Sequence, residues 1–276
     1  MGKKKEWTGE RLETGIFNET TIEHLHRYAL ALAYARGKTV LDIACGDGYG
    51  TRLLAHQAAS VTGIDKDAAT IQQAQEKYRE SNLEFLTGDA ENIPLTGNRF
   101  DLVVCFETIE HTSGQEKMMT ELKRMLKPGG LLIISTPDKV YFSARQAAPN
   151  PFHVKELTEK ELSTLLNKYF THVSLLHQQM NFSSLITGTN KSGFKMYSGG
   201  FDSIEEITSP AAMYIIGMAS DGPLEPVPAS LFTGQSLFEK AVEEKERLMK
   251  KSITYRTGHF ILLPFKWAGR LFSSGR

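Results

Sequence analysis

A glycine-rich turn between two short apolar runs is the feature that most constrains the fold of this chain. Residues 40–50 read Val-Leu-Asp-Ile-Ala-Cys-Gly-Asp-Gly-Tyr-Gly, which predicts a strand that leads through a tight turn into a helix. The next apolar run, residues 61–64, ends at Asp65. Strand, glycine turn, helix, strand and acidic residue is the order in which an open parallel sheet binds the ribose of a nucleotide-like cofactor.

The spacing of the glycines argues against a dinucleotide. A Gly-x-Gly-x-x-Gly pattern that starts at Gly46 needs its third glycine at Thr51, and one that starts at Gly48 needs it at Leu53. A pyrophosphate also favours backbone amides without a nearby carboxylate, whereas Asp47 stands inside this turn. The turn therefore favours a cofactor that carries positive charge and no phosphate.

Apolar runs and helical periodicities alternate along the rest of the chain. Strands are predicted at residues 39–43, 60–64, 83–87, 100–106, 131–135, 170–176 and 213–218, and helices at residues 20–35, 49–58, 68–80, 115–126, 157–167 and 234–251. This alternation predicts an α/β fold of Rossmann-like type, with a seven-stranded, mostly parallel sheet and helices on both faces. An N-terminal helix and a C-terminal helical tail are expected in addition.

The composition predicts three segments. Residues 1–37 are expected to form an N-terminal helical cap, residues 38–220 the α/β domain, and residues 221–276 a proline-rich linker followed by the helical tail. Residues 178–209 are polar and interrupt the domain between its last two strands, which predicts a lid over an acceptor site.

Charge and cysteine content limit the possible partners and compartment. The 276 residues include 32 acidic and 32 basic side chains, so no net charge favours nucleic acid. Two cysteines without metal-ligand spacing favour a reducing compartment, and no secretory signal is recognised, so a cytoplasmic location is expected. Basic and aromatic residues in the segment 259–276 suggest docking to the inner membrane face or to a partner protein.

Further motifs follow the glycine turn in a fixed order. Residues 42–50 resemble motif I of the class I S-adenosylmethionine-dependent methyltransferases, and residues 88–90, 100–104 and 126–130 resemble later motifs of the same family. The resemblance covers about residues 38–178, with the seventh strand near residue 213. It implies S-adenosylmethionine as cofactor, a small-molecule acceptor, and a seventh strand that runs antiparallel to the others.

The resemblance also implies which residues hold the cofactor. Asp65 is expected to accept both ribose hydroxyls, and Asp89 to approach the adenine amino group, while Asp42 organises the glycine turn. The implied cofactor-binding set is Asp42, Ala44, Gly46, Gly48, Asp65, Lys66, Asp89, Ala90 and Phe106.

A narrower resemblance concerns the acceptor. Residues 23–28, 107–111 and 150–157 resemble segments of methyltransferases from bacterial surface-polysaccharide biosynthesis. This implies O-methylation of a small molecule or of a sugar hydroxyl on a glycan. Two alternatives stay open: a quinone precursor or a lipid as acceptor, and a non-catalytic protein that binds S-adenosylmethionine as the partner of a glycosyltransferase.

Three residues are candidates for catalysis. Glu107 and His111 follow the fourth strand, and His153 lies in the loop after the fifth strand, so all three are expected at the carboxyl edge of the sheet. A neutral imidazole there could take a proton from an acceptor hydroxyl. Purely structural roles, in helix entry or in fixing a loop, are equally compatible with the sequence. Residues 107–111 do not have the His-Glu-x-x-His pattern of zinc proteases, and no metal is expected.

Overall fold

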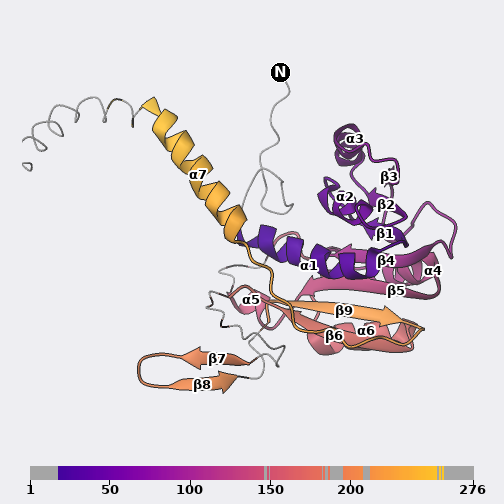
Figure 1. Ribbon diagram of the computed structural model, residues 1–276. Helices are drawn as coiled ribbons and strands as arrows, with labels where there is room; N and C mark the ends of the chain where they lie inside the picture. Colours follow the sequence, from indigo (N-terminus) through magenta and orange to yellow (C-terminus); the bar gives the residue numbers. More distant parts are fainter. Residues whose placement is uncertain are drawn as a thin grey trace, which may run out of the picture. The chain divides into compact units, whose positions relative to one another are not determined.

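In the computed structural model (Figure 1), the described residues are 18–145, 148, 150–181, 183, 186, 195–207, 212–253, 255 and 257. The helices are α1 (Glu19–Ala35), α2 (Tyr49–Ala55), α3 (Ala68–Lys77), η1 (Ile109–His111), α4 (Gln115–Met125), α5 (Phe142–Arg145), α6 (Glu159–Tyr169) and α7 (Gln235–Lys251). The strands are β1 (Thr39–Ile43), β2 (Ser60–Asp65), β3 (Leu83–Thr87), β4 (Phe100–Phe106), β5 (Leu126–Pro137), β6 (His172–Gln178), β7 (Met196–Gly199), β8 (Ile204–Ile207) and β9 (Tyr214–Ser220).

The main sheet confirms the predicted fold class. Its seven strands follow the order β3-β2-β1-β4-β5-β9-β6. The pairs from β3 to β5 are parallel, and β9 runs antiparallel to both β5 and β6. The chain leaves β1 in one direction for β2 and β3, and later adds β4 on the other side of β1. In an open α/β sheet this switch point is where ligands bind, at the carboxyl ends of the two central strands.

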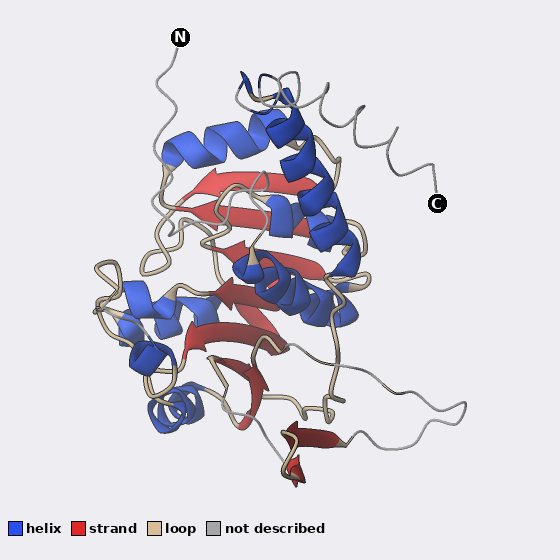
Figure 2. Ribbon diagram, turned by 90° about the vertical axis from the view of Figure 1, so that its left-hand side faces the viewer, coloured by secondary structure: helices blue, strands red, loops and turns tan. Residues whose placement is uncertain are grey.

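Helices flank the strands of the sheet (Figure 2). Alternating side chains of the strands form a core on each face of the sheet. Leu41 and Val103 point to the face that α4 and α6 cover, where Met118 and Leu166 are fully buried. Residues one position along the strands, such as Val104, point to the opposite face. Each buried aliphatic or methionine side chain contributes roughly 1.5–3 kcal/mol, so both helical layers hold the sheet.

Helix α1, the described part of the predicted N-terminal cap, packs against the sheet. A capping box between Asn18 and Thr21 begins the helix, and Tyr28 and Ala31 are buried in the core that lies between α1, α2 and the sheet. Gly50 provides the room for this packing, because a Cβ at that position would lie 1.8 Å from the Tyr28 ring. The structure thus groups α1 with the predicted domain 38–220. Residues 1–17 of the predicted cap lie outside the described residues.

A buried carboxylate connects β1 to the two helices next to it. Asp42 is 1% exposed and accepts hydrogen bonds from the Tyr28 hydroxyl of α1 at 3.2 Å and from the Thr51 hydroxyl of α2 at 2.8 Å. Burial raises the pKa of Asp42 to about 7. Its side chain therefore faces the interior and joins β1 to α1 and α2.

Two parts of the sheet region differ from the sequence expectations. Strand β5 begins at Leu126 rather than at residue 131, because Leu126 pairs with Phe100 of β4. Residues 127–130 form an irregularity before Leu131 pairs with Leu102. The insert at residues 178–209 contains an antiparallel pair, β7 and β8, where an irregular segment is predicted. Residues 182, 184, 185, 187–194 and 208–209 of the predicted lid lie outside the described residues.

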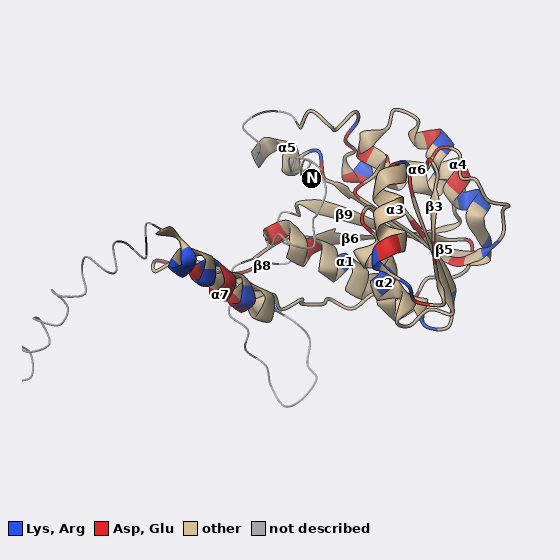
Figure 3. Cartoon of the chain, turned by 90° about the horizontal axis from the view of Figure 1, so that it is seen from above, with Lys and Arg blue, Asp and Glu red and all other residues tan. Residues whose placement is uncertain are grey.

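The chain divides between Leu231 and Phe232, later than the predicted boundary at residue 220. Leu224 and Val227 of the predicted linker pack against the core, which explains the later boundary. In the second unit, α7 carries Lys, Arg and Glu along its length (Figure 3), and its described side chains are exposed or half-buried. Among the described residues, no helix combines the length and apolar character that a membrane crossing requires. The predicted docking segment 259–276 lies outside them.

Replacement of Asp42 by Asn should remove a pH-dependent loss of stability. The unfolded carboxyl ionises near its usual pKa of about 3.9, whereas the folded one keeps its proton up to about pH 7. The folded state therefore binds more protons in this window, so Asp42 lowers stability as the pH rises from about 4 to 7. The difference between the unfolding free energies of Asp42→Asn and of the wild type, measured with urea, should increase as the pH rises across this window and stay constant above it. A difference that stays constant with pH would contradict this account.

Two shortened chains test the later domain boundary. A chain that ends at Leu231 keeps Leu224 and Val227, and its unfolding transition should match that of the first unit in the full chain. A chain that ends at Ser220 loses both side chains from the core and should be less stable by roughly 1–3 kcal/mol. Equal urea midpoints for the two shortened chains would show that residues 221–231 do not stabilise the first unit, and would support a boundary at residue 220.

Candidate active site

The turn after β1 is held in a backbone conformation that few residue types tolerate. Gly46 and Gly48 have φ angles of 55° and 82°, and Ala44 adopts a φ of 57° although it carries a Cβ. Gly48 is also restricted by space, because a Cβ there would lie 2.6 Å from the Phe85 ring. Gly46 has no heavy atom within 4 Å of such a Cβ, so its requirement is conformational. The turn leaves Ala44 exposed at the edge of the sheet.

Asp65 holds this turn through its carboxylate. One oxygen accepts a hydrogen bond from the Gly46 amide at 3.0 Å, and the other accepts one from the Asp67 amide at 2.9 Å. The side chain is 5% exposed and ends β2 beside β1. Asp65 thus lies at the end of β2, at the edge of the sheet where the ribose of the cofactor is expected.

The remaining predicted cofactor residues follow the neighbouring strands. Lys66 and Asp89 are exposed, and Ala90 is half-buried. Asp89 accepts a hydrogen bond from the Glu91 amide at 2.8 Å, which fixes the loop after β3. Phe106 is 6% exposed and packs edge-on against Tyr28, so most of its ring belongs to the core.

The segment after β4 brings acidic and imidazole side chains to the same edge. Glu107 has a φ of 48°, an unusual value for a residue with a side chain, and it turns the chain out of the strand. The Ser135 hydroxyl of β5 donates a hydrogen bond to the Glu107 carboxylate at 2.6 Å. On the other side, the Arg27 guanidinium of α1 lies 3.5 Å from the same carboxylate oxygen.

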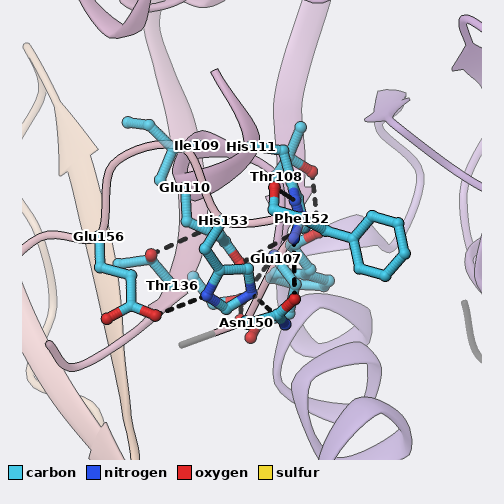
Figure 4. A network of polar contacts seen from close by, with 12 residues as sticks. Glu107, Thr108, Ile109, Glu110, His111, Thr136, Asn150, Phe152, His153 and Glu156 are labelled. Carbon is cyan, nitrogen blue, oxygen red and sulfur yellow. Dashed lines mark hydrogen bonds and ion pairs between the residues drawn. The ribbon is translucent and has the colours of Figure 1, made fainter. Parts of the chain in front are cut away.

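The two predicted catalytic histidines lie beside each other, with ring centroids 5.1 Å apart (Figure 4). His111 Nδ1 lies 2.9 Å from the Phe152 carbonyl oxygen, which can only accept, so Nδ1 carries the proton. His153 Nδ1 lies 2.6 Å from the Glu156 carboxylate and donates to it in the same way. In the neutral form of each ring, the lone pair is therefore on Nε2.

Glu110 completes this cluster and was not predicted as a site residue. Its side chain is fully buried, and the Thr136 hydroxyl donates to one carboxylate oxygen at 3.2 Å. Oε1 has no hydrogen-bond partner among the described residues. Burial, and the nearby Glu107 carboxylate, raise the pKa of Glu110 well above its usual range.

A buried charged group on α1 was also missed. Arg27 is 1% exposed, donates through Nε to the Gln178 amide oxygen at 2.7 Å, and lies over the Tyr214 ring at 4.3 Å. Glu23 is one helical turn earlier, and burial raises its pKa. Glu23 and Arg27 are four residues apart, so the sequence indicates that they share one face of the helix. It does not indicate what this face contacts, because the partners at the ends of β6 and β9 are far away in the sequence.

Comparisons with known proteins agree on one kind of domain. Residues 41–134 match the family model described as a methyltransferase domain. A probable S-adenosylmethionine-dependent methyltransferase of Mycolicibacterium smegmatis is 36% identical over 162 residues, which cover 58% of this chain and 62% of that protein. A ubiquinone biosynthesis O-methyltransferase of Coxiella burnetii is 34% identical over 103 residues, 37% of this chain and 44% of that protein. The match thus spans about three fifths of the first of these relatives.

A solved structure supports the same fold. A putative methyltransferase from Bacillus halodurans has a TM-score of 0.53 and 18% sequence identity, and the match covers 73% of this chain and 100% of that one. At this identity the likeness concerns the fold alone. Together, these findings show that residues 41–134 are similar to a methyltransferase domain and that the chain shares its fold with a solved methyltransferase.

Proposed function

We propose that the chain transfers the methyl group of S-adenosylmethionine to a hydroxyl group of a small molecule or a glycan sugar. The observation that carries this proposal is the cluster of Glu107, Glu110, His111 and His153 beside the glycine turn. β1 and β4 are parallel neighbours, and Ile43 pairs with Cys105 at their carboxyl ends. The segments that follow these strands therefore emerge side by side, which suits a cofactor on one and an acceptor on the other.

The reaction proposed is an in-line displacement. The acceptor oxygen attacks the sulfonium methyl carbon, the C–S bond breaks, and its electron pair stays on sulfur as a neutral thioether. The hydroxyl proton leaves to a group in the cluster or to water. Alignment of the two reactants can contribute roughly 7–11 kcal/mol, and a positioned base a factor of roughly 10²–10⁴.

Three side chains support hydroxyl chemistry in particular. Glu107 is positioned by Ser135 and Arg27, and the imidazoles of His111 and His153 are each oriented by a contact at Nδ1, which leaves Nε2 as the acceptor nitrogen of the ring. Carboxylates and imidazoles of this kind bind and deprotonate hydroxyl groups. The relative from Coxiella burnetii is named as an O-methyltransferase, which also favours oxygen as the acceptor atom.

The remaining alternatives for the methyl acceptor are a sugar hydroxyl and a quinone precursor, and different observations favour each. The resemblance of residues 107–111 and 150–157 to polysaccharide-biosynthesis enzymes favours a sugar hydroxyl. The relative named for ubiquinone biosynthesis favours a quinone precursor. We further propose that the insert at residues 178–209 borders the acceptor site, and that residues 221–276 contact a membrane surface or a glycosyltransferase.

Cofactor binding can be tested at Asp65. Its replacement by Ala removes acceptors for two ribose hydroxyls and for the Gly46 amide, so affinity for S-adenosylmethionine should fall by about 100-fold in titration calorimetry, since hydrogen bonds to charged groups contribute about 1.5–3 kcal/mol each. Asp202→Ala, in the exposed turn between β7 and β8, is the matched control and should bind as the wild type does. Unchanged affinity of Asp65→Ala would remove Asp65 from the cofactor site.

Methyl transfer can be tested by formation of S-adenosylhomocysteine with sugar, phenol and lipid acceptors. Glu107→Gln and His153→Asn should lose turnover by at least tenfold while they keep cofactor affinity, because the cluster acts on the acceptor. His177→Asn, a surface histidine paired with Glu159, should keep full turnover. Binding of S-adenosylmethionine without product from any acceptor class would favour the non-catalytic alternative instead.

A further inference from the structure

We propose that Glu110, His111 and His153 bind one divalent transition-metal ion, which holds the acceptor hydroxyl. One ligand atom from each of the three residues lies within 4.8 Å of the other two. Glu110 Oε1 is 4.0 Å from His111 Nε2. Two donors that each lie about 2 Å from a tetrahedral ion are roughly 3.3 Å apart, so a small movement of the His111 ring would bring this pair to the separation of metal ligands. The role in catalysis rests on the proposed function, whereas the binding of the ion does not.

Both histidines are oriented as metal ligands usually are. A metal-binding imidazole commonly donates its other N–H to a carboxylate or a backbone carbonyl, which fixes the ring and its tautomer. His153 does so to Glu156, and His111 to the Phe152 carbonyl. Each ring is therefore held in the tautomer in which Nε2 can bind a metal ion.

The buried oxygen of Glu110 is the second, independent observation. The Glu110 side chain is fully buried, and Oε1 lacks a hydrogen-bond partner among the described residues although Oε2 has Thr136. A buried carboxylate oxygen without a partner is costly, and a cation bound by Oε1 would remove that cost. This oxygen lies on the side of His111, where the ion would be.

The backbone holds the ligands together before any ion binds. The amides of Val154 and Lys155 both donate to the Glu110 carbonyl oxygen, at 2.8 and 3.0 Å. The Gln115 side chain bridges the carbonyl oxygens of Ile109 and Lys155. The loop that carries His153 is thus fixed against the turn that carries Glu110 and His111 (Figure 4).

The donor set indicates the class of ion. Two imidazoles and one carboxylate suit Zn²⁺, Mn²⁺ or Fe²⁺, whereas Mg²⁺ and Ca²⁺ favour all-oxygen sites. The Asn150 amide now lies 3.0 Å from His153 Nε2, so the ion would displace it, and rotation of the amide would offer its oxygen as a fourth ligand. A remaining position can take the acceptor hydroxyl, whose pKa the ion lowers, with the proton released to solvent.

The test is a metal titration of the full chain after dialysis against a chelator. Zn²⁺ and Mn²⁺ are titrated by calorimetry without S-adenosylmethionine or acceptor, and Co²⁺ is followed by its visible absorption. The wild type should bind one equivalent, more tightly than Mg²⁺. His111→Asn, His153→Asn and Glu110→Gln should each weaken binding by at least 30-fold, and Glu156→Gln by about 10- to 100-fold.

His177→Asn is the matched control and should bind within twofold of the wild type, because it removes a histidine outside the cluster. Glu110→Gln keeps the size of the buried side chain, and its urea unfolding without metal shows that the variant folds. Absence of stoichiometric binding by the wild type would overturn the proposal, as would equal binding by the three ligand variants.

The role of the ion in methyl transfer is tested by a separate activity assay. If the ion binds and methyl transfer after chelation equals that with Zn²⁺ or Mn²⁺, the assigned role is overturned. A loss of at least tenfold on chelation, restored by the ion, supports it. Failure of methyl transfer under every condition, with the titration as predicted, would overturn the proposed function while the metal site stands.

Discussion

The parallel pairing of β1 with β4 is the constraint on which the rest of the candidate site depends. Because the strands are in register up to Ile43 and Cys105, both chains leave the sheet at the same level and in the same direction. On the β1 side, the left-handed turn is held by Asp65 from the next strand. On the β4 side, Glu107 adopts a left-handed conformation as well. Conformational strain on both sides of one switch point is typical of functional sites.

Helix α1 contacts residues on both the β1 side and the β4 side of this edge. Tyr28 donates to Asp42 under the glycine turn, and Arg27 reaches Glu107 one residue earlier on the helix. One helix therefore supports both halves of the site. The Arg27 contacts with Gln178 and Tyr214 extend this support to the ends of β6 and β9. Shifts of α1 would move the glycine turn and the segment after β4 together.

Local patterns in the sequence were sufficient for the sheet, because its strands are short apolar runs bounded by glycine, proline or acidic residues. The start of β5 was missed since the Lys-Pro-Gly-Gly segment has the composition of a turn, and only the pairing of Leu126 with Phe100 places the start of the strand before it. The boundary at residue 220 was too early because Leu224 and Val227 contact the core from a segment that has the composition of a linker. The cofactor turn was visible as a motif, whereas the cluster depends on contacts between distant residues, such as His111 and His153.

The central claim is that S-adenosylmethionine binds at the β1–β4 edge with its methyl group toward the cluster after β4. A crystal structure of the full chain with S-adenosylhomocysteine tests this most directly. The account predicts ribose hydroxyls at hydrogen-bond distance from the Asp65 carboxylate and the ligand sulfur facing Glu107 and His153. A ligand bound away from Asp65, or with its sulfur turned from these residues, would contradict it.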